Sequence, residues 1–174
     1  DILVVDALNL SPKVQRYHIG FMGCYAAFPA LKMAYQFCEL DRSAKVIVVC
    51  LELCSLHFQN KDDLDTIVAN SVFADGAAAI LVSSEPPAPG RNGYQIDQFS
   101  CNLANEGRSD MAWDIGDQGL NIVLSKYVAR IIGAGIQEMM KEAIHGMGHT
   151  LGEITQWAVH PGGRAILDKV ETEL

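Results

Sequence analysis

One segment near the end of the chain, TQWAVHPGGRAILDKVE, predicts a buried strand, a tight turn and a helix in immediate succession. The apolar residues 157–159 indicate the end of the strand, Pro161 and two glycines favour the turn, and residues 164–170 begin a helix. His160 therefore lies at the turn itself. Side chains at such turns project from the carboxyl edge of a sheet, where open α/β sheets bind ligands. The segment thus predicts an α/β fold with a histidine facing a ligand-binding crevice.

A second turn of the same kind carries Cys24. Residues 17–23 indicate a strand, and Cys24 opens a helix whose N-terminal dipole favours a thiolate. A cysteine at one turn and a histidine at another make a nucleophile with an acid/base partner. Taken singly, each has a structural alternative: Cys24 fits a buried packing residue, and His160 fits a satisfied core histidine.

The composition suits one compact globular domain, with 49% hydrophobic and 20% charged residues over 174 positions. A formal net charge of −8 without a basic cluster argues against nucleic-acid partners and against an anionic membrane surface. No stretch reaches the ~18 consecutive apolar residues of a membrane span. We also expect no secretory signal at the start of the chain. The five cysteines are odd in number and irregular in spacing, which favours free thiols in a reducing cytoplasm.

Helix and strand patterns alternate along the rest of the chain. A helix occupies residues 1–10, and the helix after Cys24 carries an apolar stripe that ends at Cys38. The run KVIVVC at 45–50 has no alternation and predicts a strand buried on both faces. The further predicted elements are a helix at 66–73, a strand at 76–83, a linker at 85–92, a strand at 94–101, a hairpin formed by MAWDIG and LNIVL, and a helix at 131–144.

Three segments together resemble a known family. GFMGCYAAFPALKMA, VFADGAAAILV and WAVHPGGRAILDKVE are similar to the type III polyketide synthases, the chalcone-synthase-like homodimers. The HPGG turn followed by RAILD is the specific signal, because the cysteine segment alone would fit any condensing enzyme of the thiolase fold. CYAAF, where plant chalcone synthases have CFAGG, is closer to bacterial members that make alkylpyrones or alkylresorcinols. The resemblance implies a thiolase-like layered α/β/α fold and a homodimer.

The resemblance also implies an acyltransferase that works by decarboxylative Claisen condensation. Cys24 would take a starter acyl group, expected to be fatty, from coenzyme A, and malonyl-CoA would supply the extender. His160 and a later asparagine would stabilise the enolate oxygen, while the backbone N–H at Cys24 would stabilise the acyl-transfer oxyanion. No cofactor or metal is implied, because the coenzyme A thioesters are themselves the substrates.

Further positions take roles by resemblance to the family. Phe73 stands where the family has a gatekeeper phenylalanine, Ile122 at the second gatekeeper position, and Trp113 where plant enzymes have a cavity-lining glycine. Phe73 also fits a plain core residue, and a one-residue slip of the hairpin would reverse the faces of Trp113 and Ile122.

The remaining positions concern the cavity and coenzyme A. Cys54 and His57 replace two cavity threonines, and although both are metal ligands by type, no second ligand pair accompanies them at zinc spacing. Ala165 would touch the pantetheine arm, and Arg164 could meet a phosphate.

The chain is expected to be incomplete at both ends of the fold. Only 14 residues follow His160, and the family's asparagine, its glycine-rich loop and its basic N-terminal region have no counterpart here. Residues 1–84 would be the C-terminal part of the first thiolase-like half, and 85–174 the N-terminal part of the second. Activity of this chain alone is therefore in doubt. Two alternatives stay open: a ketoacyl synthase III-like or other thiolase-fold condensing enzyme, and a non-catalytic fragment.

Overall fold

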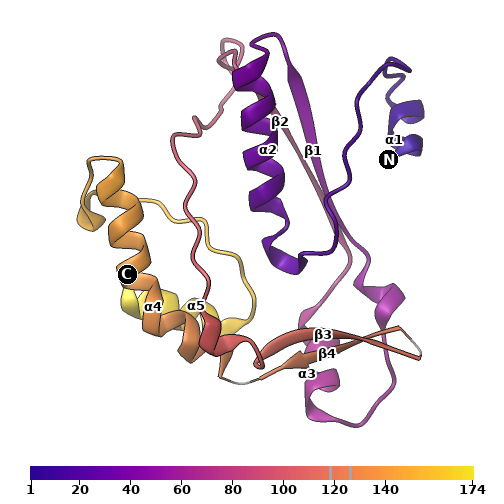
Figure 1. Cartoon of the computed structure of the whole chain (residues 1–174), viewed down its shortest axis with the longest axis vertical. Helices are drawn as coiled ribbons and strands as arrows, with labels where there is room; N and C mark the ends of the chain where they lie inside the picture. The colour runs from indigo at the N-terminus through magenta and orange to yellow at the C-terminus, as the bar shows by residue number, and fades with distance from the viewer. Residues whose placement is uncertain (118, 126) are drawn as a thin grey trace.

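The computed structural model describes residues 1–117, 119–125 and 127–174. Helices and strands alternate as the sequence predicts, and short 3-10 turns lie between them (Figure 1). The elements are α1 (Ile2–Ala7), η1 (Gly23–Tyr25), α2 (Ala27–Leu40), β1 (Lys45–Glu52), η2 (Cys54–His57), α3 (Leu64–Val72), β2 (Gly76–Ser83), η3 (Asn105–Gly107), β3 (Met111–Gly116), β4 (Gly119–Leu124), α4 (Val128–Gly146), η4 (Leu151–Glu153) and α5 (Arg164–Glu173). Among the described residues, no helix is both long and apolar enough to cross a bilayer.

The main core joins α2 to an antiparallel ribbon made of β1 and β2. Figure 1 shows α2 running alongside this ribbon, and Ala34 and Cys38 on the helix pack against Val48 and Val82 on the strands. The Cys38 thiol lies 3.6 Å from the Val82 carbonyl oxygen, to which it donates a weak hydrogen bond. Cys38 is thus the packing residue that its place on the helical stripe predicts.

The opposite face of the same ribbon is open. Ile47, Val49, Leu51 and Leu81 are exposed, because side chains alternate along a strand and only one face of the ribbon is covered by α2. The prediction that β1 is buried on both faces is therefore wrong for this structure. A continuous apolar run allows burial of both faces of a strand. In the described residues, only the face toward α2 is covered.

A second antiparallel ribbon, β3–β4, lies across the lower end of the first ribbon in Figure 1. It confirms the predicted hairpin. The ribbon packs on α3, and two hydrogen bonds fasten the loop before α3 to β4: the Gln59 amide donates to the Leu120 carbonyl at 2.7 Å, and Lys61 donates to the Asn121 side chain at 2.8 Å.

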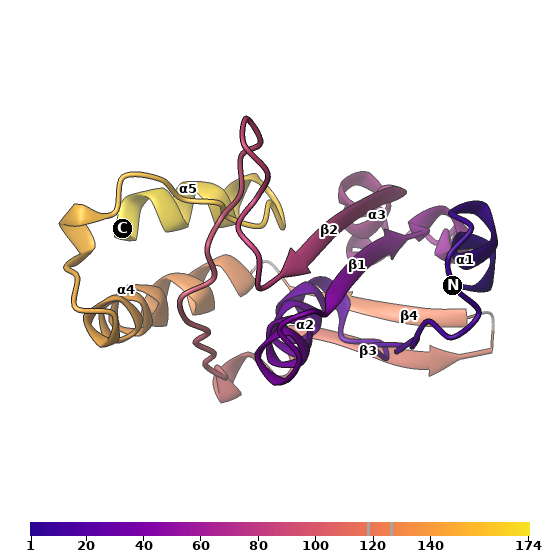
Figure 2. The same ribbon diagram turned by 90° about the horizontal axis from the view of Figure 1, so that it is seen from above.

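The helices α4 and α5 pack side by side and form the third unit (Figure 2). Ile144 and Val170 are buried in this unit. The aliphatic part of Lys169 lies over Gly133, where a Cβ atom would meet it, and the Lys169 ammonium pairs with Glu173 at 2.6 Å. The small residue in α4 therefore lets α5 approach closely.

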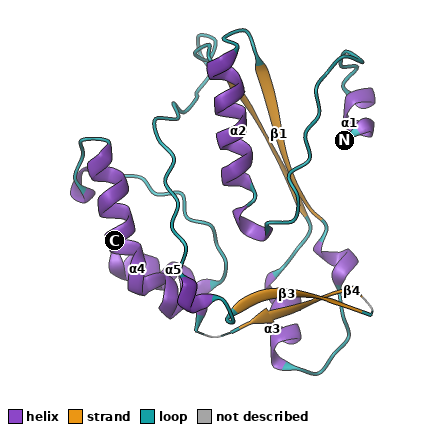
Figure 3. Ribbon diagram, viewed as in Figure 1, coloured by secondary structure: helices purple, strands orange, loops and turns teal. Residues whose placement is uncertain are grey.

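Three predicted strands are loop segments without ladder hydrogen bonds (Figure 3); the first of them bends at Phe21, and its last residue, Gly23, belongs to η1. Residues 17–23, 94–101 and 157–159 have no neighbouring strand within the described chain. A strand exists only when a second strand pairs with it. The segment 94–101 instead packs on α2 through Ile96 and Phe99, and the Phe99 ring meets Tyr35 edge-on at 5.8 Å.

Candidate active site

The turn that carries Cys24 lies directly in front of α2, as predicted. Cys24 is the middle residue of η1, and the backbone N–H of Ala26 closes this turn on the Gly23 carbonyl at 3.1 Å. Gly23 has a φ of +56°, a conformation that glycine adopts without steric cost. The turn therefore presents an exposed thiol at the start of a 14-residue helix.

The surroundings of Cys24 disfavour its thiolate. Although the residue is exposed, partial desolvation of the thiol raises its pKa, and the charges of Glu52 and Cys54 raise it further; a hydrogen bond from its own backbone N–H opposes them. A cation near the sulfur would oppose this shift and favour the thiolate. Glu52 was not among the predicted site residues. The one feature of the sequence that could have indicated it is its position two residues before Cys54.

Cys54 lies at the other end of β1, in a turn fastened to the start of β2. Asp75 accepts hydrogen bonds from the Ser55 backbone N–H at 2.7 Å and from Ser55 Oγ at 2.6 Å. Desolvation, Glu52 and Asp75 raise the pKa of the half-buried Cys54. His57 ends the same turn with an exposed side chain. Cys54 and His57 thus lie on one short turn whose position is set by Asp75.

Three aromatic rings from distant parts of the chain meet at Trp113. Trp113 on β3 stacks on Phe73, with ring centroids 6.2 Å apart and planes 24° apart. Phe21, three residues before Cys24, meets Trp113 edge-on at 5.5 Å and 86°. We call Phe21, Phe73 and Trp113 the aromatic cluster.

The register of the hairpin settles the faces of its two predicted site residues. Trp113 pairs with Ile122 directly across the ribbon, so both side chains lie on the same face. Phe73, Trp113 and Ile122 are all half-buried. The structure therefore gathers Phe73, Trp113 and Ile122 into one apolar wall.

The histidine turn has the conformation that its glycines predict. Gly162 donates its backbone N–H to the His160 carbonyl at 3.0 Å, and Gly163 precedes α5 with a φ of +132°. His160 is exposed, and its ring lies close to Gly162. The His160 backbone is therefore fixed by the turn, while its imidazole is accessible.

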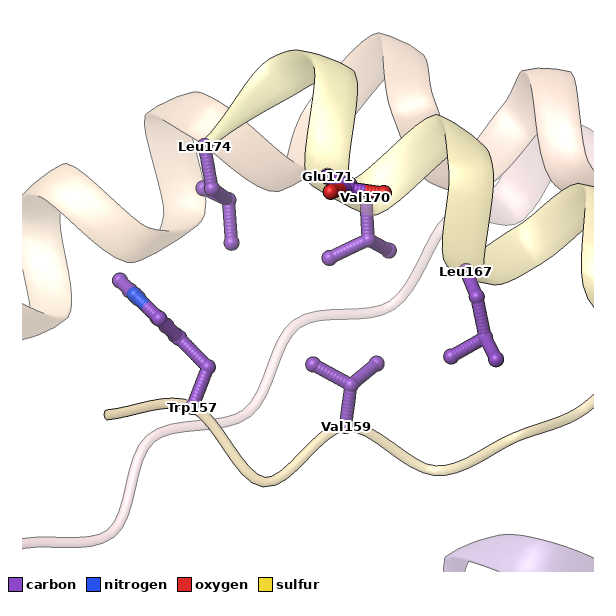
Figure 4. A pocket seen from close by; sticks show the side chains of 6 residues that line it. All are labelled: Trp157, Val159, Leu167, Val170, Glu171 and Leu174. Atoms are coloured by element: carbon purple, nitrogen blue, oxygen red, sulfur yellow. The ribbon is translucent and has the colours of Figure 1, made fainter. Parts of the chain in front are cut away.

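A pocket of about 330 Å³ lies between α5 and the extended segment that leads to His160 (Figure 4). Its lining is apolar apart from one carboxylate and comprises Trp157, Val159, Leu167, Val170, Glu171 and Leu174. Trp157 and Val159 both face the pocket, as alternation along an extended chain allows. None of the predicted site residues lines this pocket, so it is distinct from the candidate active site.

Two predicted coenzyme A contacts lie at the start of α5. Arg164 is exposed, and its Nε pairs with Asp168 at 2.7 Å on the same helix. Ala165 is exposed beside it. A phosphate would have to compete with Asp168 for the guanidinium. The role of both residues stays a prediction.

The pairing of Cys24 with His160 also stays a prediction. Within the described structure these two side chains share no hydrogen bond, and the residues that influence the Cys24 thiol are Glu52 and Cys54. The described residues likewise contain no group of three or more His, Cys, Asp or Glu side chains placed to hold a metal ion.

Both halves of the chain are similar to known domains. Residues 1–86 match the N-terminal domain of chalcone and stilbene synthases, and residues 96–174 match their C-terminal domain. The chain is 31% identical over 173 residues to "Alpha-pyrone synthesis polyketide synthase-like Pks18" of Mycobacterium tuberculosis. It is 30% identical over 177 residues to "Probable polyketide synthase 1" of Dictyostelium discoideum.

Two solved structures are similar to this chain over 98% of its residues. PKS-I from the brown alga Ectocarpus siliculosus has a TM-score of 0.91 at 26% identity, and the C-terminal type III polyketide synthase domain of Steely1 from Dictyostelium has 0.83 at 29%. The chain covers 45% and 48% of those chains, 44% of Pks18 and 6% of the Dictyostelium protein. It therefore spans less than half the length of these relatives. The similarities confirm the predicted family resemblance and the thiolase-like fold.

Proposed function

This chain belongs to the chalcone and stilbene synthase family, and on that premise we propose that it condenses an acyl-CoA starter with malonyl-CoA by decarboxylative Claisen chemistry. The Cys24 thiolate attacks the starter carbonyl and expels the coenzyme A thiolate. Malonyl-CoA loses carbon dioxide, and the resulting enolate carbon attacks the acyl thioester and releases Cys24.

The observation that carries the proposal is the wall formed by Phe73, Trp113 and Ile122. These residues come from both halves of the chain, and Phe21 extends their contact to the segment that leads into Cys24. A wall of this kind suits an apolar starter held beside a nucleophilic thiol.

His160 acts as the proton acceptor for the Cys24 thiol. Because desolvation and Glu52 raise the thiol pKa, the reaction requires a proton acceptor that becomes a cation beside the sulfur. His160, accessible on its rigid turn, supplies this group and then donates to the enolate oxygen. Arg164 and Ala165 contact the coenzyme A arm, with Arg164 leaving Asp168 for a phosphate.

The starter class is a fatty acyl group. Cys54 and Ile122 replace the groups that receive an aromatic starter in chalcone synthases, and small residues at 26, 27 and 30 leave room beside Cys24. Each methylene buried in an apolar tunnel contributes ~0.8 kcal/mol. The name of Pks18 refers to α-pyrone synthesis, and an alkyl α-pyrone is the product class we infer. The family further suggests a cytoplasmic homodimer.

The test is acylation of the protein by acyl-CoA, followed by intact mass. We expect one adduct, lost in Cys24→Ala and retained in Cys101→Ala, since Cys101 is also an exposed free cysteine. The adduct should form faster with longer straight chains than with coumaroyl-CoA. An adduct that survives Cys24→Ala would overturn the assignment of the nucleophile, and a preference for coumaroyl-CoA would overturn the starter class.

A further inference from the structure

Phe21 contacts Trp113 although its side chain is largely exposed. The side chain is 66% exposed, at a bend in a loop segment without ladder hydrogen bonds. Its ring nevertheless meets Trp113, which lies 92 positions further along the chain, at 5.5 Å and nearly perpendicular. Such edge-to-face pairs are favourable beyond their buried area.

The two ring contacts of Trp113 constrain different motions. The stack on Phe73, at 24° between planes, fixes the plane of the indole. The perpendicular contact with Phe21, at 86°, reaches the indole from the segment that leads into Cys24. Together they hold Trp113 in one orientation on the ribbon face that it shares with Ile122.

We propose that Phe21 is a positioning residue that sets starter length by fixing the place of Trp113. The inference rests on the proposed function, because a wall matters only if an acyl chain grows or enters against it. With Phe21 in place, the indole limits how far an acyl chain on Cys24 extends along the apolar wall. When Phe21 is removed, the indole turns aside and a longer straight-chain fatty acyl group is accepted.

The first experiment measures the rate of Cys24 acylation across straight-chain acyl-CoAs from short to long. Phe21→Ala should move the fastest chain length upward by two or more carbons, and each newly accommodated methylene should add about fourfold in rate or affinity. Phe21→Tyr, which keeps the ring, should restore the original length. Phe28→Ala is the matched control, because Phe28 is also a half-exposed ring near Cys24 but stacks on Tyr25 instead.

A double variant tests whether Phe21 acts through Trp113. Trp113→Gly should lengthen the accepted chain, and adding Phe21→Ala to it should change little more, since the residue being positioned is gone. An unchanged length optimum in Phe21→Ala, or fully additive shifts in the double variant, would overturn the proposal while Cys24 acylation still supports the condensing function.

A second readout needs no reaction. The sequence has two tryptophans, so Trp157→Phe leaves Trp113 as the sole indole. In that background Phe21→Ala should lower the fluorescence anisotropy of Trp113, and Phe21→Tyr should restore it. An unaltered anisotropy would refute the positioning role. If no acyl-CoA acylates Cys24 in any variant, the proposed function fails, and the anisotropy still decides whether Phe21 holds Trp113.

Discussion

The carboxylate of Asp75 accepts both hydrogen bonds that Ser55 can donate, one from its backbone and one from its hydroxyl. This pair joins the turn after β1 to the residue before β2, so the turn that carries Cys54 is tied to the ribbon that supports α2. These two bonds join the ends of the segment from Ser55 to Asp75, which contains α3 and Phe73.

Acid should weaken the fold through Asp75. The hydrogen bonds from Ser55, that from its hydroxyl first, lower the pKa of Asp75. Since the folded pKa lies below the unfolded value of about 3.9, the stabilising effect is complete above about pH 5 and is lost as pH falls through the folded pKa. We expect Asp75→Asn to be less stable than the parent at pH 7 and to depend less on pH in the acid range.

Urea unfolding at several pH values measures this effect. Asp62→Asn is the control, because Asp62 is an exposed carboxylate in the same inter-strand segment. The interpretation would be wrong if Asp75→Asn and the parent lost stability in parallel as pH falls.

Removal of the Glu52 charge should make Cys24 more reactive. Desolvation is the largest cause of its raised pKa and Glu52 is the next, so Glu52→Gln lowers the thiol pKa and increases the thiolate fraction near neutral pH. The measurement is iodoacetamide alkylation of the Cys24 peptide, followed by mass spectrometry across a pH series. Glu138→Gln, on α4, should leave the profile unchanged. Identical profiles for Glu52→Gln and the parent would contradict the electrostatic assignment.

His160 should act on the same thiol in the opposite direction. His160→Gln keeps a hydrogen-bond donor but removes the cation that an ion pair requires, so we expect slower alkylation of Cys24 near neutral pH. His145→Gln, at the C-terminal end of α4, serves as the control. Equal alkylation rates in His160→Gln and the parent at every pH would reject the pairing.

The glycine before α5 should resist substitution. Gly163 has a φ of +132°, where an L side chain is strained, so Gly163→Ala should cost about 1–3 kcal/mol of stability. Gly135 lies inside α4 with open space where its Cβ would be, and Gly135→Ala should instead stabilise by up to about 1 kcal/mol. Urea midpoints compare the two variants. A neutral or stabilising Gly163→Ala would show that the turn relaxes without strain.

Local patterns predicted the helices and the two hairpin strands well. The boundaries of β2 and the strand segments around Gly119 match the structure, and α2 begins within a few residues of Cys24. These elements depend on periodicity and on turn residues that lie within them. The predicted strands at 17–23, 94–101 and 157–159 do not form in the described chain. A strand needs a pairing partner, and its own residues do not specify that partner.

The sequence placed Trp113 and Ile122 on a hairpin, but it did not determine the contacts that these residues make. The faces of Trp113 and Ile122 could not be chosen from sequence, since a one-residue slip reverses them, and the register of the ribbon decides the matter. The contact of Phe21 with Trp113 joins segments 92 positions apart and left no local signal. The influence of Glu52 on Cys24 was missed for the same reason.

The core that joins α2 to the first ribbon has a consequence for synthesis. Its buried residues Ala34, Cys38, Val48 and Val82 lie in one continuous stretch of the chain, so it can collapse while the hairpin is still inside the ribosome, because translation proceeds from the N-terminus and domains fold in that order. The turn that carries Cys24 then precedes a helix, α2, that is already packed on its ribbon before Trp113 leaves the ribosome. During that interval a nascent chain carries the exposed Cys24 thiol before Trp113 and Ile122 have joined Phe73 in the apolar wall.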